Sequence, residues 1–197
     1  RYEKWARLQI EWEQMRDETI RNLKFPFSYR EGQFNLAASV YRTIARKKKL
    51  FIQAPTGTGK TMAVLYPAVR AMGEGLGEKI FYLTARTITR TVAEQAFFIL
   101  KEKGLKFRSV TLTAKEKICF CEKAECNPQA CPYAKGHLDR VNDAVYDLLK
   151  NGGGMGRKEI EEQAEKFQVC PFEFALDLSV WADGIICDYN YVFDPDA

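Results

Sequence analysis

The chain has 197 residues, of which 46% are hydrophobic, and a formal net charge of +4. This hydrophobic content is sufficient for a packed core and excludes an intrinsically disordered chain. At about 150 residues per domain, the length predicts one or two domains. The mild positive charge permits a nucleic-acid partner without requiring one. Because no apolar run approaches the roughly 20 residues of a membrane span, we expect no membrane partner.

The N-terminus and the cysteine content indicate where the protein works. The first residues are charged and follow a helical pattern, so we predict no signal peptide. Six cysteines in a chain without an export signal favour a reducing compartment, in which cysteines more often bind metals than form disulfides. We therefore expect a cytoplasmic protein. Because the chain begins with Arg1, we also expect it to be part of a longer polypeptide.

Hydrophobic periodicity predicts an α/β chain with a parallel sheet. Helices are expected over residues 1–23, 31–47, 61–72, 88–102, 137–149, 157–167 and 172–181, and strands over 50–52, 79–84, 108–112 and 184–188. The alternation of strands and helices stops at Thr113 and resumes after Pro171, so the intervening segment is predicted to be an insertion. The predicted domains are a linker helix (1–24), an α/β domain (25–112), the insert (113–171) and a return to the α/β domain (172–197).

Residues 54–61 have the composition of a phosphate-binding loop. Ala54 stands where the usual pattern has its first glycine. The two glycines allow backbone N–H groups to turn inward around phosphate oxygens. Lys60 is then placed to bind the β- and γ-phosphates, and the Thr61 hydroxyl to ligate Mg²⁺. A plain glycine-rich turn would not explain the order of Lys60 and Thr61. The predicted phosphate-binding residues are Pro55, Thr56, Gly57, Thr58, Gly59, Lys60 and Thr61, of which the last two are the catalytic candidates.

A cluster of cysteines predicts a metal site in the insert. Cys119, Cys121, Cys126 and Cys131 are followed by Cys170, and thiolates suit Zn²⁺ or an iron–sulfur cluster. A four-ligand site leaves one of the five unused, and Cys121 is the choice because it follows Cys119 so closely. The absence of paired C-x₂-C knuckles disfavours zinc. By contrast, Cys187 is predicted to be a small core residue and His137 a surface residue.

Several motifs, in order, resemble the N-terminal part of the iron–sulfur superfamily 2 DNA helicases, the XPD/DinG-like group. Residues 25–30 with Gln33 resemble the family's Q motif, residues 54–61 motif I, and residues 82–87 motif Ia. Residues 112–119 resemble the approach to the first cluster ligand. Cys131-Pro132-Tyr133 and Cys170-Pro171-Phe172 resemble later ligand sites, and residues 182–195 resemble the segment that leads to the DEAH box.

The resemblance implies an ATP-dependent 5′→3′ DNA helicase of DNA repair or replication, with a RecA-like domain and a small, mainly helical iron–sulfur insert. It implies adenine recognition by Arg30 and Gln33 and contacts with single-stranded DNA by Thr84, Arg86 and Thr87. The implied [4Fe–4S] ligands are Cys119, Cys126, Cys131 and Cys170. The implied cofactors are ATP, Mg²⁺ and the cluster; the implied partners are single-stranded or forked DNA and a second RecA-like domain of the same polypeptide. A bacterial, nucleoid-associated location is also implied.

The DEAH box itself does not occur in the sequence. Asp188, Asp194 and Asp196 lack its context, so none is assigned as the Mg²⁺-ordering acid. We expect this segment alone to hydrolyse ATP poorly. Two alternatives remain: another P-loop NTPase, such as a kinase or a switch, and a zinc-stabilised nucleic-acid-binding module with a vestigial loop. DNA-stimulated ATP hydrolysis tests the first alternative, and the visible absorbance of an iron–sulfur cluster tests the second.

Overall fold

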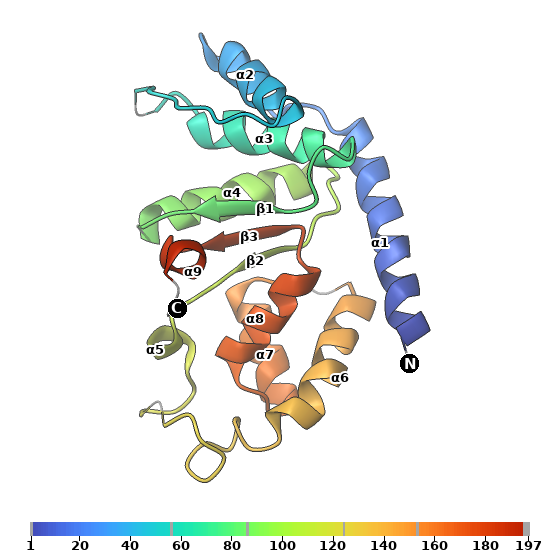
Figure 1. The fold of residues 1–197 in the computed structure, drawn as a ribbon, viewed down its shortest axis with the longest axis vertical. Coiled ribbons are helices and arrows are strands. Elements are labelled where there is room, and N and C mark those ends of the chain that lie inside the picture. The colour runs from blue at the N-terminus through green and yellow to red at the C-terminus, as the bar shows by residue number, and fades with distance from the viewer. Residues whose placement is uncertain (1, 56, 86, 124, 153, 195–197) are drawn as a thin grey trace. The chain divides into compact units, whose positions relative to one another are not determined.

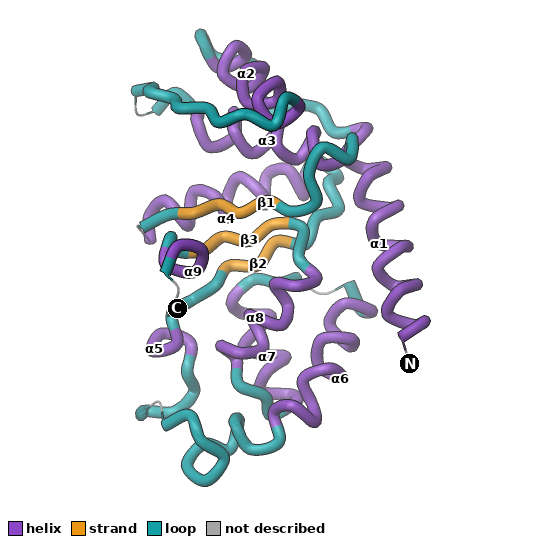
Figure 2. Tube along the Cα trace, viewed as in Figure 1, coloured by secondary structure: helices purple, strands orange, loops and turns teal. Residues whose placement is uncertain are grey.

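The computed structural model describes residues 2–55, 57–85, 87–123, 125–152 and 154–194. Figures 1 and 2 show an α/β chain with one small sheet. Its elements in order are α1 (Tyr2–Asn22), α2 (Gln33–Ala45), α3 (Lys60–Gly73), β1 (Ile80–Leu83), α4 (Thr87–Glu102), β2 (Ser109–Thr111), α5 (Lys115–Ile118), α6 (His137–Lys150), α7 (Arg157–Phe167), α8 (Pro171–Trp181), β3 (Gly184–Cys187) and α9 (Asn190–Phe193). No helix of the described ranges is both long and apolar enough to cross a bilayer.

The sheet has the strand order β1-β3-β2, so the last strand of the chain lies between the first two (Figure 1). β2 and β3 are parallel, with Val110 opposite Ile185. The predicted parallel sheet is therefore confirmed. Residues 112–183 connect two neighbouring parallel strands, the topology expected when a segment is inserted into a strand–helix–strand crossover. β3 is buried along its whole length, and Cys187 is fully buried, as predicted.

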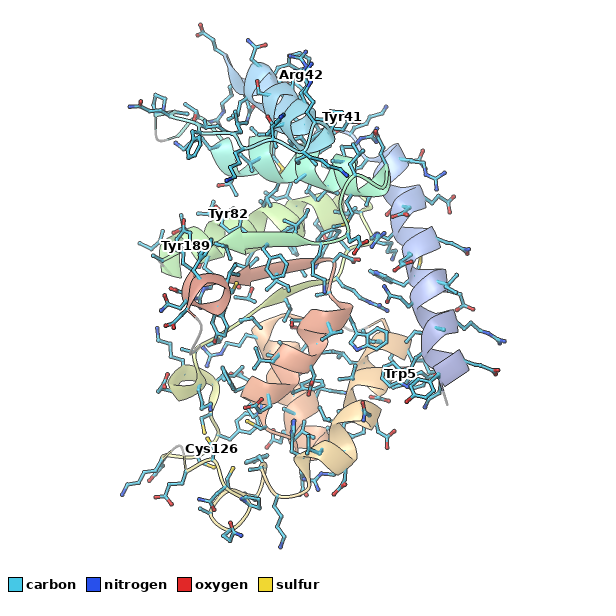
Figure 3. All side chains as sticks on the ribbon, viewed as in Figure 1. Trp5, Tyr41, Arg42, Tyr82, Cys126 and Tyr189 are labelled. Atoms are coloured by element: carbon cyan, nitrogen blue, oxygen red, sulfur yellow. The ribbon has the colours of Figure 1, made fainter. Side chains whose placement is uncertain are left out.

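By internal packing, the chain divides into two compact units, and the sheet lies in the first. This sheet unit comprises the described residues within 1–9, 81–85 and 108–197. Its core lies where α6, α7 and α8 pack together, and Ile160, Phe174 and Leu178 are fully buried there. Trp5, labelled in Figure 3, joins α1 to this unit because its ring stacks on Trp181 with centroids 4.8 Å apart.

The second unit comprises the described residues within 10–80 and 86–107, and we call it the loop unit. The rings of Phe97 and Phe107 stack in its core with centroids 5.1 Å apart. α1 and α3 approach closely at Gly73, where a Cβ atom would lie 2.4 Å from Cγ2 of Ile20. Arg70 of α3 donates through Nη1 to the carbonyls of Ile20 and Arg21, both at 2.8 Å, and so binds the C-terminal end of α1. The domain boundaries predicted from the sequence, at residues 24, 112 and 171, differ from this division into two packing units. They stay predictions.

One predicted strand is wrong. Residues 50–52 lie outside the strands of the described chain, and Phe51 is 93% exposed. An apolar run predicts burial, but a strand also needs a neighbour that pairs with its backbone. β1 was predicted correctly as a strand and lies at the edge of the sheet, but the side chain of Phe81 is 53% exposed. The predicted helices are confirmed to within a few residues, whereas the short helices α5 and α9 were not predicted.

Candidate functional site

The phosphate-binding loop leads directly into α3 in the loop unit. Gly57 and Gly59 have φ angles of 81° and 73°, left-handed values that glycine adopts without strain. Gly59 is the N-cap of α3, and Lys60 is the first residue of the helix. Thr58 closes the loop by donating its hydroxyl to the carbonyl of Pro55 at 3.0 Å. The positive end of the α3 dipole thus lies at the loop, an arrangement that favours anions.

Lys60 bends back over its own loop. Its Nζ donates to the carbonyl of Ala54 at 2.9 Å and also to the carbonyl of Pro55. The ammonium is thus held against the loop backbone by two carbonyl oxygens. An incoming phosphate would exchange these carbonyls for charged oxygens, which form stronger hydrogen bonds.

Gln33 and Arg30 support the loop from the side. The Gln33 amide donates through Nε2 to the carbonyl of Gly59 at 3.2 Å and accepts the Arg30 N–H through Oε1 at 3.0 Å. Arg30 donates through Nη1 to the carbonyl of Gly57 at 2.5 Å. Gln33 is only 6% exposed, so both ends of its amide bind protein groups. The structure therefore brings the two Q-motif residues to the loop glycines, a contact that the sequence did not predict.

A pocket of about 600 Å³ lies between this loop and α4, within the loop unit. This volume is within the range of small-molecule and cofactor sites. Its lining combines the loop side (Phe27, Arg30, Gly57, Gly59, Lys60, Thr61 and Met62) with α4 (Thr91, Val92, Gln95, Ala96 and Ile99). Thr61 is half-buried and lines the pocket, and its role as a Mg²⁺ ligand stays a prediction. Of the predicted phosphate-binding residues, Thr56 lies outside the described part of the chain.

The predicted DNA contacts are described only in part. Thr84 follows β1 in the sheet unit, where its N–H donates to the carbonyl of Cys187 at 3.0 Å, and only 6% of the residue is exposed. Arg86 lies outside the described residues, and of Thr87 only the backbone is described. The role of these three residues stays a prediction.

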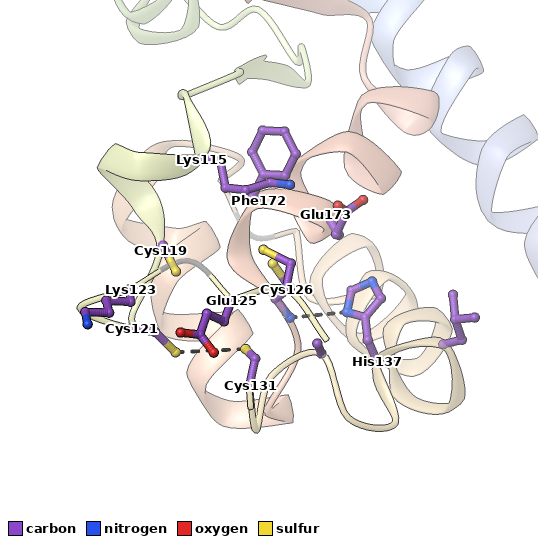
Figure 4. Close-up of a pocket in the computed structure, with 13 residues that line it drawn as sticks. Lys115, Cys119, Cys121, Lys123, Glu125, Cys126, Cys131, His137, Phe172 and Glu173 are labelled. Carbon is purple, nitrogen blue, oxygen red and sulfur yellow. Dashed lines mark hydrogen bonds between the residues drawn. The ribbon is translucent and has the colours of Figure 1, made fainter. Parts of the chain in front are cut away.

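The five cysteines of the insert line one pocket in the sheet unit (Figure 4). The pocket has a volume of about 180 Å³, and its cysteines come from three places: the end of α5, the long loop before α6, and the residue before α8. The Sγ atoms of Cys121 and Cys131 lie 3.9 Å apart. Figure 3 labels Cys126 on that loop, and it is the one exposed cysteine among the six described. No disulfide joins them.

The thiols of this pocket resist deprotonation. Desolvation, with the neighbouring thiols of Cys131 and Cys119, raises the pKa of the Cys121 thiol to about 11. Burial likewise raises the pKa of Cys170. Thiolates this close repel one another, which favours the protonated thiols. A bound metal would lower the thiol pKa values again, because it stabilises the deprotonated form. Within the described ranges, however, no three His, Cys, Asp or Glu side chains are arranged as a metal site. The sulfur atoms converge on one pocket without forming a coordination shell.

His137 is a site residue whose burial the sequence did not predict. It was predicted to be a surface residue, but it is 8% exposed and lines the cysteine pocket. Its Nδ1 accepts the N–H of Cys170 at 3.2 Å (Figure 4). The surface prediction is wrong because the segment before α8 folds over the first turn of α6 and covers the ring. The available signal was its position as the sole histidine, within the cysteine-bearing segment.

The glycine-rich loop at the N-terminus of α3 and its pocket define the class: a P-loop nucleotide-binding protein. The DEAD/DEAH box helicase family matches residues 35–127, and the DEAD_2 family matches residues 84–197. The second match covers more than half of the chain. The chain belongs to the DEAD_2 family.

Similar proteins are named as helicases. The chain is 24% identical to "Regulator of telomere elongation helicase 1 homolog" of Caenorhabditis briggsae and 25% identical to the protein of that name from Caenorhabditis elegans. Each alignment covers 88% of this chain and 22% of the relative. "Probable ATP-dependent helicase MJ0942" of Methanocaldococcus jannaschii is 43% identical over 80% of this chain and 30% of that protein. The chain therefore spans less than a third of the length of these relatives.

Proposed function

We propose that this chain is the nucleotide-binding part of an ATP-dependent DNA helicase, a RecA-like domain that carries an iron–sulfur insert. The observation that carries the proposal is the joint presence, in one DEAD_2 chain, of a formed phosphate-binding loop and of five cysteines that converge on one pocket. Another P-loop NTPase would leave the cysteine pocket without a purpose.

The proposed nucleotide roles combine the sequence pattern of the loop with its observed contacts. The backbone of residues 55–59 would surround the phosphates, with Lys60 on the β- and γ-phosphates and Thr61 on Mg²⁺. Gln33 and Arg30, which donate to the carbonyls of Gly59 and Gly57, would recognise the adenine. The acid that orders Mg²⁺ and the transition-state arginine would come from the rest of the polypeptide, including a second RecA-like domain.

We assign Cys119, Cys126, Cys131 and Cys170 as the residues that would hold a [4Fe–4S] cluster. Their soft sulfur donors fit such a group, and all four line the same pocket. When bound, the cluster would cross-link the three cysteine-bearing segments and so stabilise the insert. Thr84, Arg86 and Thr87 would contact the backbone of single-stranded or forked DNA without reading sequence. We further propose 5′→3′ movement, a role in DNA repair or replication, and a cytoplasmic, nucleoid-associated location.

One distance favours zinc as a second candidate for this pocket. A tetrahedral zinc site with Zn–S bonds of about 2.3 Å places its sulfur atoms about 3.8 Å apart. Cys121 and Cys131 lie 3.9 Å apart. A zinc site would therefore use Cys121, whereas the proposed cluster leaves it unused.

The test uses the full-length protein purified without oxygen. The proposal expects bound iron and inorganic sulfide, visible absorbance, and ATP hydrolysis that single-stranded DNA stimulates. It also expects strand separation on forked duplexes, lost in Lys60→Ala. Colourless protein with stoichiometric zinc would show that the pocket holds zinc and not a cluster. ATP hydrolysis that DNA does not stimulate would refute the helicase assignment.

A further inference from the structure

His137 occupies an unusual place in the cysteine pocket. It is the only histidine of the chain and the first residue of α6, and it is almost fully buried beside the cysteines. Buried polar side chains nearly always bind a partner, so we expect a partner group to face each ring nitrogen of His137.

The two ring nitrogens of His137 face the residue before α8 and a residue within α8. Nδ1 accepts the backbone N–H of Cys170, the residue that precedes α8, at 3.2 Å. An accepting Nδ1 places the ring proton on Nε2. Nε2 lies 3.7 Å from Oδ2 of Asp177, on α8. His137 thus faces both the residue before α8 and the middle of that helix: Nδ1 accepts a hydrogen bond, and Nε2 faces a carboxylate oxygen at 3.7 Å.

Arg140 holds the same segment from the next turn of α6. Residues three apart share one face of a helix, so Arg140 and His137 face the same way. Arg140 donates to the carbonyls of Phe167 at 2.9 Å and of Gln168 at 2.6 Å. It also donates to the carbonyl of Lys135 at 2.7 Å, on the loop that carries Cys131. The first turn of α6 therefore fixes the backbone on both sides of the pocket.

We propose that His137 is a positioning residue for the metal group: it holds Cys170 at the pocket before the metal binds, with Asp177 orienting its ring. This inference rests on the proposed metal-binding function of the cysteines. The contact needs no metal, because its donor and acceptor are both protein groups. A ligand already in place lowers the conformational cost of assembling the site and slows its loss.

The test compares two substitutions in the full-length protein. His137→Asn places an amide oxygen where Nδ1 stands and keeps the acceptor, whereas His137→Leu leaves the Cys170 N–H without one. We expect His137→Leu to release the metal group to a chelator about 10- to 100-fold faster than the wild type. His137→Asn should stay close to the wild type. Lys150→Ala, an exposed residue at the opposite end of α6, is the control and should change nothing.

A second readout does not depend on the metal. In the metal-free protein, hydrogen exchange of the peptide containing the Cys170 amide should quicken in His137→Leu and not in His137→Asn. If His137→Leu does not fold, Asp177→Asn provides the test, with faster exchange and faster release expected. Release and exchange at wild-type rates in a folded His137→Leu would overturn the positioning role. A wild-type protein that binds neither cluster nor zinc would refute the proposed metal function, and with it this role, even if the exchange data confirmed the contact.

Discussion

Removing the ammonium of Lys60 tests the nucleotide site most directly. In the ligand-free loop this group already bonds the carbonyls of Ala54 and Pro55, so a phosphate would replace existing bonds. A hydrogen bond to a charged group contributes about 1.5–3 kcal/mol net. We take one such bond as the net gain in binding free energy when the Lys60 ammonium exchanges the two carbonyls for phosphate oxygens. Lys60→Ala should therefore weaken ATP binding about 10- to 150-fold.

Hydrolysis should fall further than binding in Lys60→Ala. Charge builds up on the transferred phosphoryl group in the transition state, and removing one fixed donor there costs about 10²- to 10³-fold in kcat. The assay is titration of the full-length protein with ATP, followed by DNA-stimulated hydrolysis at saturating ATP. Lys48→Ala, an exposed lysine of the same unit, matches the change in net charge. An ATP affinity of Lys60→Ala within about twofold of the Lys48→Ala value would refute the assignment.

Three further predictions concern the sheet unit. Cys119→Ser should lose the visible absorbance of the cluster and Cys121→Ser should keep it; equal absorbance in both would contradict the proposed ligand set. Asp183→Ala removes the buried carboxylate that accepts the Arg108 backbone N–H at 2.8 Å and that attracts the Arg108 guanidinium. Urea unfolding should therefore show a loss of about 1–3 kcal/mol. A loss below about 1 kcal/mol would refute this account. Hydrogen bonds from Gln163 and Lys166 lower the pKa of Asp147 in the folded protein. The ionised Asp147 therefore stabilises the folded state above the unfolded pKa of about 3.9, and this contribution is lost as the pH falls through the lower folded pKa. Asp147→Asn should flatten that part of the acid-unfolding curve, and an unchanged curve would contradict the prediction.

The sequence predicted those elements whose signal lies within a single segment. The helices were placed correctly because an apolar stripe at helical spacing reports its own buried face. The left-handed glycines and Lys60 at the start of α3 follow from the loop pattern alone. The strand predicted over residues 50–52 was wrong because an apolar run does not reveal whether a neighbouring strand pairs with it.

The partners of site residues could not be read from the sequence, because they come from distant segments. His137 is separated from Cys170 by 33 residues, and no local pattern at the start of α6 shows what covers it. The same holds for Gln33, which meets the carbonyl of Gly59 across 26 residues. Residue type and spacing predicted which groups gather at each site, whereas their resting contacts depend on how the loops fold over the helices.

These resting contacts explain how the phosphate-binding loop can be formed before nucleotide arrives. Lys60 bonds two carbonyls of the loop, and Gln33 and Arg30 bond the carbonyls of the two left-handed glycines. The carbonyls of Gly57 and Gly59 are thereby turned towards Arg30 and Gln33, so the N–H groups of the same two peptides, which belong to Thr58 and Lys60, point the opposite way. The Ala54–Pro55 peptide has no N–H group, so the contact of Lys60 with the Ala54 carbonyl orients no donor. Arg30 and Gln33 therefore fix the direction of two N–H groups of the loop, whereas an incoming phosphate would compete with the carbonyls of Ala54 and Pro55 for the Lys60 ammonium.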